Sequence, residues 1–134
     1  MSQPVHLIRS RSLAEVDYAY AATAPAGSRV VFLAGSCPLD SRGRTVGVGD
    51  HEAQARCVVD NLVQALSDAG ATLDQVLCTR VLVASTHRHD LVRVWDVVRR
   101  AFGDHDVPST LLGVTVLGYP DQLVEVEAVA AVQD

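Results

Sequence analysis

The sequence contains few aromatic residues, no long apolar run and no recognisable leader segment, and each of these shortages excludes a class of protein. Aromatic side chains make up 4% of the chain although 49% of it is hydrophobic, so alanine and valine supply most of the apolar surface. No apolar run reaches the roughly 18 residues that a membrane span requires. The N-terminal stretch MSQPVHLIRSRS lacks the apolar segment and cleavage site of a signal peptide. We therefore expect a cytoplasmic protein that has no membrane partner.

Metal-ligating residues and positive charge are also sparse. Cys37, Cys57 and Cys78 are widely spaced and form no C-x-x-C pair, which predicts reduced thiols rather than a disulfide framework or a zinc site. The turn THRHD holds His87 and His89 without a third ligand at helical spacing, so we expect a solvated loop there. The net charge of −5 and the scattered basic residues give no electrostatic support for nucleic-acid binding. We expect no metal and no nucleic-acid partner.

A length of 134 residues predicts a single domain over residues 1–134. Alternating or β-branched runs predict strands, and apolar residues spaced by three and four predict helices. The most secure helix runs from His51 to Ala69, with Asp50 as its N-cap and Gly70 as its stop. The other expected elements are strands at Val5–Ser10, Ser28–Gly35 and Asp74–Ser85, a helix at His89–Phe102, a hairpin-like closing pair that breaks at Gly118–Gln122 and resumes over Leu123–Val132, an optional strand at Thr45–Val48, and an ambiguous lead-in at Leu13–Ala22.

This order of elements indicates an α+β fold in which both helices cover one face of one sheet. The strand at Ser28–Gly35 is predicted to be buried because it is short, β-branched and bounded by glycines. The other face of the sheet would be bare and rich in valine and leucine. Such a face is best explained by burial against other subunits.

Several stretches resemble the RidA/YjgF family of reactive-intermediate deaminases over nearly the whole chain. They are Tyr20 ahead of VVFLAGSCPLDSRG, the run QARCVVDNLVQALSDAGATLDQVLCTRVLV, Pro108, and the closing LVEVEAVA. Each stretch is a weak signal alone, but their order and spacing together are specific. The resemblance implies a chorismate-mutase-like fold and a homotrimer whose sheets form a central β-barrel. It also implies a small-molecule cleft at each subunit boundary, and we expect no cofactor.

The resemblance gives the two carboxylates of the closing strand different roles. Because side chains alternate along a strand, Glu125 and Glu127 share one face. In typical deaminating members an arginine stands two places after the proline, and a glutamate that orients or deprotonates water stands fifteen places after that arginine. These places hold Thr110 and Glu125 in this chain. Glu125 and Thr110 are therefore the catalytic candidates, and Glu127 is expected to be structural.

The threonine at position 110 changes what the cleft is expected to recognise. An arginine pairs with a carboxylate through a planar fork of donors, whereas Thr110 offers one hydroxyl and no charge. We therefore expect 2-imino acids to be poor substrates unless another cation reaches the cleft. The candidates for that cation are Arg29, Arg42, Arg44 and Arg88.

The remaining candidates for ligand contact surround these positions. Tyr20, or Tyr18 if the register differs, is expected to close the cleft. The backbone N–H groups of Gly35 and Ser36 are expected to hold an oxyanion, since a glycine lets a ligand approach the backbone. The other expected contacts are Cys37, as a buried thiol rather than a nucleophile, Ser109 and Leu111.

These features favour an enamine or imine deaminase-type hydrolase that acts on a small metabolite, with Glu125 positioning water. Two alternatives stay open. A non-catalytic metabolite-binding trimer is favoured by the missing arginine. A tailoring enzyme for a larger, less charged substrate is favoured by the apolar residues that follow Thr110. Endoribonuclease activity, which is attributed to some relatives, fits poorly with the acidic charge of the chain.

Overall fold

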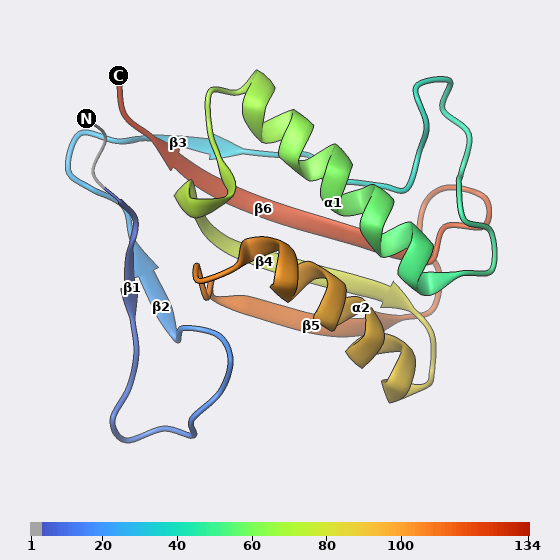
Figure 1. Cartoon of the computed structure of the whole chain (residues 1–134), viewed down its shortest axis with the longest axis horizontal. Helices are drawn as coiled ribbons and strands as arrows, with labels where there is room; N and C mark the ends of the chain where they lie inside the picture. Colours follow the sequence, from blue (N-terminus) through green and yellow to red (C-terminus); the bar gives the residue numbers. More distant parts are fainter. Residues whose placement is uncertain (1–3) are drawn as a thin grey trace.

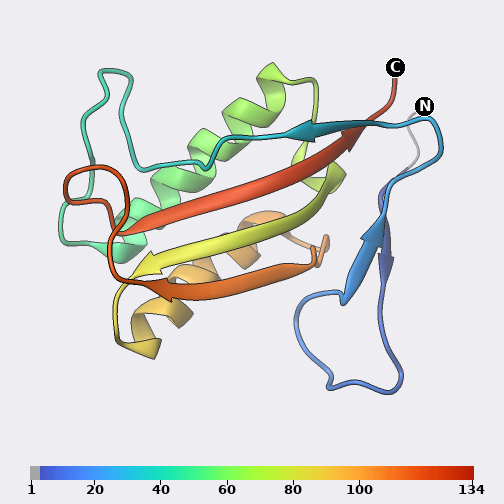
Figure 2. The ribbon, with the colours of Figure 1, turned by 180° about the vertical axis from the view of Figure 1, so that it is seen from behind.

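The computed structural model describes residues 4–134 and contains a four-stranded sheet, a two-stranded sheet and two helices (Figure 1). Both helices lie on one face of the larger sheet, and the opposite face of the described chain carries none (Figure 2). The α+β arrangement is therefore as the order of elements predicts. The elements are β1 (His6–Ile8), β2 (Ala21–Thr23), β3 (Arg29–Phe32), α1 (His51–Asp68), the 3-10 turn η1 (Leu73–Gln75), β4 (Val76–Ala84), α2 (Arg88–Phe102), β5 (Ser109–Val114) and β6 (Val124–Val132).

The C-terminal strands do not form the expected hairpin-like pair. The strand order of the larger sheet is β3-β6-β4-β5, with β5 parallel to β4, and with β6 antiparallel to both β3 and β4. Because β4, α2 and β5 form a β-α-β crossover, β5 lies parallel beside β4. The chain then crosses the end of β4, and β6 pairs on the other side of that strand. The expected pair is therefore wrong: both strands are present, but β4 separates them.

The first helix has the sequence signals that were expected at its ends. The Asp50 side chain accepts a hydrogen bond from the Ala53 N–H at 3.0 Å, which satisfies one unpaired amide of the first turn of α1. Ala69 is the C-cap of α1, and Gly70 follows with a φ of +81°, a left-handed conformation that favours glycine. Within residues 4–134, neither helix combines the length and the apolar character of a membrane span.

The predicted strands are present but shorter than expected. Asp74 belongs to η1, and β4 begins only at Val76. The optional strand near residue 45 is reduced to a single bridge between Leu39 and Thr45. The lead-in segment contributes β2, which pairs antiparallel with β1 in the small sheet.

The core lies between the helices and the covered face of the larger sheet. Alternate residues of β4 and β6 point toward the helices and are buried. Apolar residues of α1 and α2, spaced by three and four, pack against them. Fully buried members of this core include Val58, Leu62, Leu66, Val81, Val83, Val94, Val124 and Val126.

The uncovered face of the larger sheet, here called the open face, carries exposed apolar side chains. Phe32 is 79% exposed and Val30 is 50% exposed, because no helix of the described chain covers this face. The expectation that this strand is buried is therefore wrong: β3 is an edge strand in which Arg29, Val30 and Phe32 are exposed and Val31 is half-buried. By strand alternation and register the open face comprises Val30, Phe32, Cys78, Arg80, Leu82, Ala84, Thr110, Leu112, Val114, Glu125, Glu127, Val129 and Ala131.

A buried amide joins α1 to the turn that precedes β6. Gln54 is fully buried, and its Nε2 donates to the carbonyl oxygens of Asp121 at 2.9 Å and of Gly47 at 3.3 Å. Its Oε1 accepts a hydrogen bond from the Leu123 N–H at 2.7 Å. One side chain thus pairs three backbone groups that the fold removes from water. It thereby fixes the point at which β6 begins.

Replacing Gln54 by alanine should lower the free energy of unfolding by about 1 to 3 kcal/mol, because it leaves buried backbone groups without partners. Urea denaturation followed by circular dichroism measures this change. Gln64 on the exposed side of the same helix donates to Asp68 at 2.9 Å and serves as the control. Gln64→Ala should cost less than about 0.5 kcal/mol. Equal losses in the two variants would contradict the role given to the buried amide.

Candidate functional site

Glu125 lies on the open face, where the segment after β3 continues alongside β6. Ser36 and Val126 exchange two backbone hydrogen bonds, of 2.8 and 3.1 Å. This bridge brings residues 35–37 beside the carboxylate. A Cβ placed on Gly35 would lie 2.4 Å from Oε2 of Glu125, a distance at which the two atoms would clash. The carboxylate can occupy this space because Gly35 has no side chain.

Two side chains donate to the same oxygen of the Glu125 carboxylate. Nε2 of Gln122 donates to Oε1 at 3.1 Å, and the Cys37 thiol donates to it at 3.3 Å. Gln122 is buried, and its own Oε1 accepts a hydrogen bond from the Tyr119 N–H at 3.0 Å. These contacts fix one carboxylate oxygen. The other, Oε2, accepts no hydrogen bond from residues 4–134 and is left for water or a ligand.

Cys37 is placed as a hydrogen-bond donor and not as a nucleophile. Burial and the adjacent Glu125 carboxylate raise the pKa of its thiol to about 11, so the thiol keeps its proton at neutral pH. Asn61 of α1 donates from Nδ2 to the carbonyl oxygens of Cys37 at 2.8 Å and of Leu39 at 3.0 Å. The helix therefore holds the loop that carries the thiol.

Thr110 borders a different hollow, at the exposed edge of β5. The Trp95 indole N–H donates to Oδ2 of Asp17 at 3.1 Å, and Nε of Arg99 lies 3.2 Å from the same oxygen. The Tyr18 ring meets the Trp95 ring edge-on, with ring centroids 6.2 Å apart. The hollow is thus walled by aromatic rings and holds a paired carboxylate. It has a volume of about 340 Å³ and is lined by Asp17, Tyr18, Trp95, Ser109, Thr110 and Leu111.

Strand register separates the predicted site residues into two groups. Thr110 is the register partner of Arg80 on β4, whereas Glu125 is the partner of Leu82. Because β4 lies between β5 and β6 and neighbouring strands are about 4.8 Å apart, Thr110 and Glu125 are on the order of 10 Å apart or more. One group contains Glu125, Gly35, Ser36 and Cys37, and the other contains Ser109, Thr110 and Leu111.

Two of the expected ligand contacts are already engaged elsewhere. Of the two tyrosines left open by the sequence, Tyr18 lines the hollow at β5. Tyr20 stacks edge-on against it at 5.9 Å, and its hydroxyl donates to the Ala14 carbonyl at 2.6 Å. The Ser36 N–H donates in the bridge to β6, so the amide expected to hold an oxyanion is occupied in this arrangement.

None of the four arginines expected as a substitute at position 110 lines the hollow there, as far as residues 4–134 define it. Arg29, at the opposite edge of the sheet, pairs with the side-chain carboxylate of Asp134 at 2.9 Å. Arg44 pairs with Asp40 at 3.0 Å, and Arg42 belongs to the same loop. Arg88 borders a third hollow.

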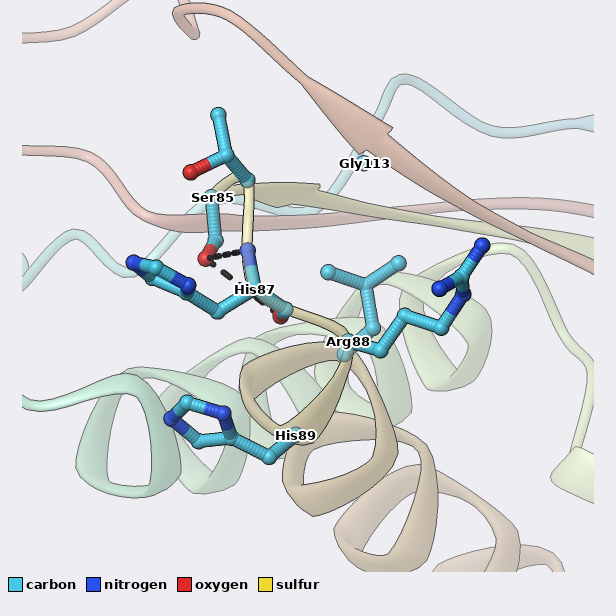
Figure 3. Close-up of a pocket in the computed structure, with 7 residues that line it drawn as sticks. Ser85, His87, Arg88, His89 and Gly113 are labelled. Atoms are coloured by element: carbon cyan, nitrogen blue, oxygen red, sulfur yellow. Dashed lines mark hydrogen bonds between the residues drawn. The ribbon is translucent and has the colours of Figure 1, made fainter.

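This third hollow, of about 430 Å³, lies at the start of α2 (Figure 3). The rings of His87 and His89 lie on one side of it, and Arg88 is directed toward the other side (Figure 3). The two rings stack with centroids 5.5 Å apart, and the Ser85 hydroxyl accepts a hydrogen bond from the His87 N–H at 2.9 Å. The turn is exposed, as the sequence predicts. Among residues 4–134, no three His, Cys, Asp or Glu side chains are grouped so that they could hold a metal ion.

Sequence reasoning missed the partners that hold these groups in place. Gln122 stands in the turn before β6, and an isolated glutamine in a turn carries no signal that it will contact Glu125. Helical spacing places Trp95 on the apolar stripe of α2, and its ring does pack against the core. Its indole N–H also reaches Asp17, 78 residues earlier in the chain, a contact that periodicity cannot indicate.

A mixed sheet with two helices on one face, and a glutamate held where β6 meets the segment after β3, define a small α+β protein of the Rid type. The chain belongs to the family described as endoribonuclease L-PSP, whose sequence model matches residues 10–132. The resemblance to the RidA/YjgF family is therefore confirmed.

Individual relatives agree with this assignment. A RutC family protein of Pyrococcus abyssi is 30% identical over 100 residues, which cover 75% of this chain and 76% of that protein. The 3-aminoacrylate deaminase RutC of Acinetobacter baylyi is 29% identical over 109 residues, which cover 77% and 79% of the two chains. The crystal structure of YyfB from Yersinia pestis, a conserved Rid protein of unknown function, matches with a TM-score of 0.88 at 25% identity, covering 97% of this chain and 100% of that one.

Glu125→Gln should lower the pKa of the Cys37 thiol below its value of about 11, because it removes the negative charge that disfavours the thiolate. Burial remains, so the pKa should stay above that of an ordinary cysteine. Titration of thiolate absorbance in a Cys57→Ser, Cys78→Ser background measures it.

Glu127→Gln is the matched control for this titration, since Glu127 lies two residues along the same strand and pairs with Arg80. It should leave the Cys37 titration unchanged. An unchanged pKa in Glu125→Gln would show that the carboxylate does not act on the thiol.

Proposed function

We propose that the protein is a hydrolase of small enamines and imines in which the Glu125 carboxylate positions and activates the attacking water. The geometry of this carboxylate carries the proposal. Gln122 and Cys37 hold Oε1, whereas Oε2 accepts no hydrogen bond within residues 4–134. A general base must lie within hydrogen-bond reach of the proton that it takes. One fixed oxygen and one available oxygen suit that task.

The reaction needs a proton acceptor in its first step and a proton donor in its second. The water oxygen bonds to the carbon of the protonated imine while Glu125 takes a proton from that water. The carbinolamine then receives this proton on nitrogen, and the C–N bond breaks so that ammonia leaves. The carbonyl forms as the hydroxyl O–H bond breaks, and its proton passes to Glu125 and from there to ammonia, which leaves as ammonium. An enamine enters the same path once protonation at carbon has converted it to the iminium ion. Each turnover consumes one water and releases one ammonia.

Water is the nucleophile in this scheme because the chain offers no better one at the site. The sequence contains no lysine, so a Schiff base with a lysine side chain is excluded. The raised pKa of Cys37, at about 11, keeps its sulfur as a neutral thiol, which is a weak nucleophile.

The relatives support this substrate class over a nucleic acid. RutC of Acinetobacter baylyi is named as a deaminase of 3-aminoacrylate, which is an enamine that carries a carboxylate. The family description names an endoribonuclease. A net charge of −5 and the two carboxylates Glu125 and Glu127 on one face disfavour a polyphosphate substrate for this chain.

The proposal includes a homotrimer with a ligand cleft at each subunit boundary. The open face exposes Val30, Phe32 and Leu112, and monomeric proteins rarely expose contiguous apolar surface of this kind. Covering this face with the sheets of two further copies would bury those side chains. It would also screen Glu125 from bulk water, which strengthens electrostatic interactions at the site.

Glu125→Gln should lower kcat for imine hydrolysis by at least about 100-fold, the lower range for loss of a general base. Gly35→Ala should lower it too, because the new Cβ takes the space of Oε2. Gly118→Ala, whose Cβ would meet nothing within 4 Å, is the control and should keep the wild-type rate. The assay measures ammonia release from imines that amino-acid and amine oxidases generate, against a blank without the protein.

A wild-type rate in Glu125→Gln would sink the general-base role. If the wild type accelerates none of these imines but binds the corresponding oxo product, the protein is a metabolite-binding trimer instead.

Light scattering should give a mass of three copies of the 14.3 kDa chain. Phe32→Asp should shift this mass toward the monomer, because it places a charge where the open face would be covered. Val92 on α2 is also exposed, at 52%, so Val92→Asp tests a charge outside the open face and should leave the mass unchanged. A wild-type chain that stays monomeric at micromolar concentration would contradict the trimer.

A further inference from the structure

A row of polar residues crosses the otherwise apolar open face. Thr110 on β5, Arg80 on β4 and Glu127 on β6 are direct register partners. Most of the face around this row is made of valine, leucine, alanine and phenylalanine. Glu125 lies on the same face of β6, two residues before Glu127. The central member of the row is Arg80, and it is the direct register partner of Thr110, where the resemblance implies an arginine in deaminating members.

The guanidinium of Arg80 retains most of its binding capacity. Its ion pair with Glu127 is long, at 3.9 Å, and in a single copy of the chain the two side chains are 56% and 41% exposed. An exposed pair of this kind contributes little to stability. A guanidinium carries five N–H donors in a planar fork that matches a carboxylate. Arg80 can therefore accept a second anion beside its present partner.

Register also places Arg80 nearer to Glu125 than Thr110 is. Arg80 is opposite Glu127, and Glu125 is its diagonal neighbour on the adjacent strand. Diagonal neighbours on paired strands lie about 7 to 8 Å apart, a span that a small molecule bridges. Thr110 is a further strand away, because β4 lies between β5 and β6.

We infer that Arg80 binds the carboxylate of the ligand, in place of an arginine at position 110. This inference rests on the proposed function, since it names a substrate class for the same site. The ligand carboxylate then lies at β4, one strand away from position 110 on β5. Thr110 remains beside it as a hydroxyl donor. The ligand is then a short imino or enamino acid, with its carboxylate at Arg80 and its C–N bond at Glu125. With Arg80 in this role, 2-imino acids are expected to be substrates even though position 110 holds a threonine.

The test compares Arg80→Gln with the wild type on two kinds of substrate. One is a 2-imino acid made by an amino-acid oxidase, and the other is a carboxylate-free imine made by an amine oxidase. Loss of a charge-assisted bidentate contact should lower kcat/KM for the imino acid by at least about tenfold, mostly through KM. The rate on the carboxylate-free imine should change less than about twofold. Arg80→Gln combined with Thr110→Arg should restore part of the imino-acid activity.

Arg56→Gln is the matched control, since Arg56 is also exposed and also makes one ion pair, with Glu52 at 3.6 Å, but lies on α1. It should leave both substrates unaffected. Calorimetry with the 2-oxo acid product gives a readout that does not depend on turnover, and Arg80→Gln should weaken this binding by a similar factor.

Three outcomes would overturn the assignment of Arg80. They are equal losses on both substrates, unchanged binding of the oxo acid, or dispersal of the assembly in Arg80→Gln with no rescue by Thr110→Arg. A wild type that binds the oxo acid through Arg80 but hydrolyses neither imine would instead refute the proposed reaction and leave the carboxylate site standing.

Discussion

The position of the candidate site depends on the buried amide of Gln54. Its three backbone partners belong to the loop before α1 and to the turn before β6, two segments that are also joined by the hydrogen bond from the Thr45 hydroxyl to the Pro120 carbonyl. A buried amide of this kind is favourable only when all its groups are paired, so the geometry admits little variation. Because this turn sets where β6 begins, it also sets the register position of Glu125 in the sheet. A core contact thus determines the geometry of a surface carboxylate.

The second constraint is the close approach between Gly35 and Glu125. Both strands of the bridge are fixed by backbone hydrogen bonds, so the carboxylate cannot move away without breaking its bonds to Gln122 and Cys37. Asn61 holds the loop from the helix side. The result is a carboxylate whose Oε1 is held by two donors and whose Oε2 lies against Gly35 and accepts no hydrogen bond within residues 4–134. Glu127 differs from Glu125 in this respect, because its carboxylate pairs with Arg80 across the open face.

Much of this arrangement follows from local sequence patterns. The caps at Asp50 and Gly70 and the apolar spacing of α1 are encoded within a few residues, so the helix could be predicted closely. Alternation alone places Glu125 and Glu127 on one face. The strand order could not be obtained in this way, because the insertion of β6 beside β4 depends on contacts between distant segments. The same is true of Gln122 and of the pairing of Trp95 with Asp17, in which nothing local distinguishes the functional partner from an ordinary turn or core residue.

The comparison of position 110 with its neighbours shows why residue-by-residue transfer from a family has limits. A missing arginine at one place in the chain suggests that the charge has been lost. On a sheet, however, a ligand contacts side chains of several neighbouring strands. Residues 30 positions apart in the sequence can therefore be direct neighbours on two adjacent strands. Arg80 and Thr110 are such a pair. Strand register therefore places one guanidinium, Arg80, and two carboxylates, Glu125 and Glu127, on the same face as Thr110.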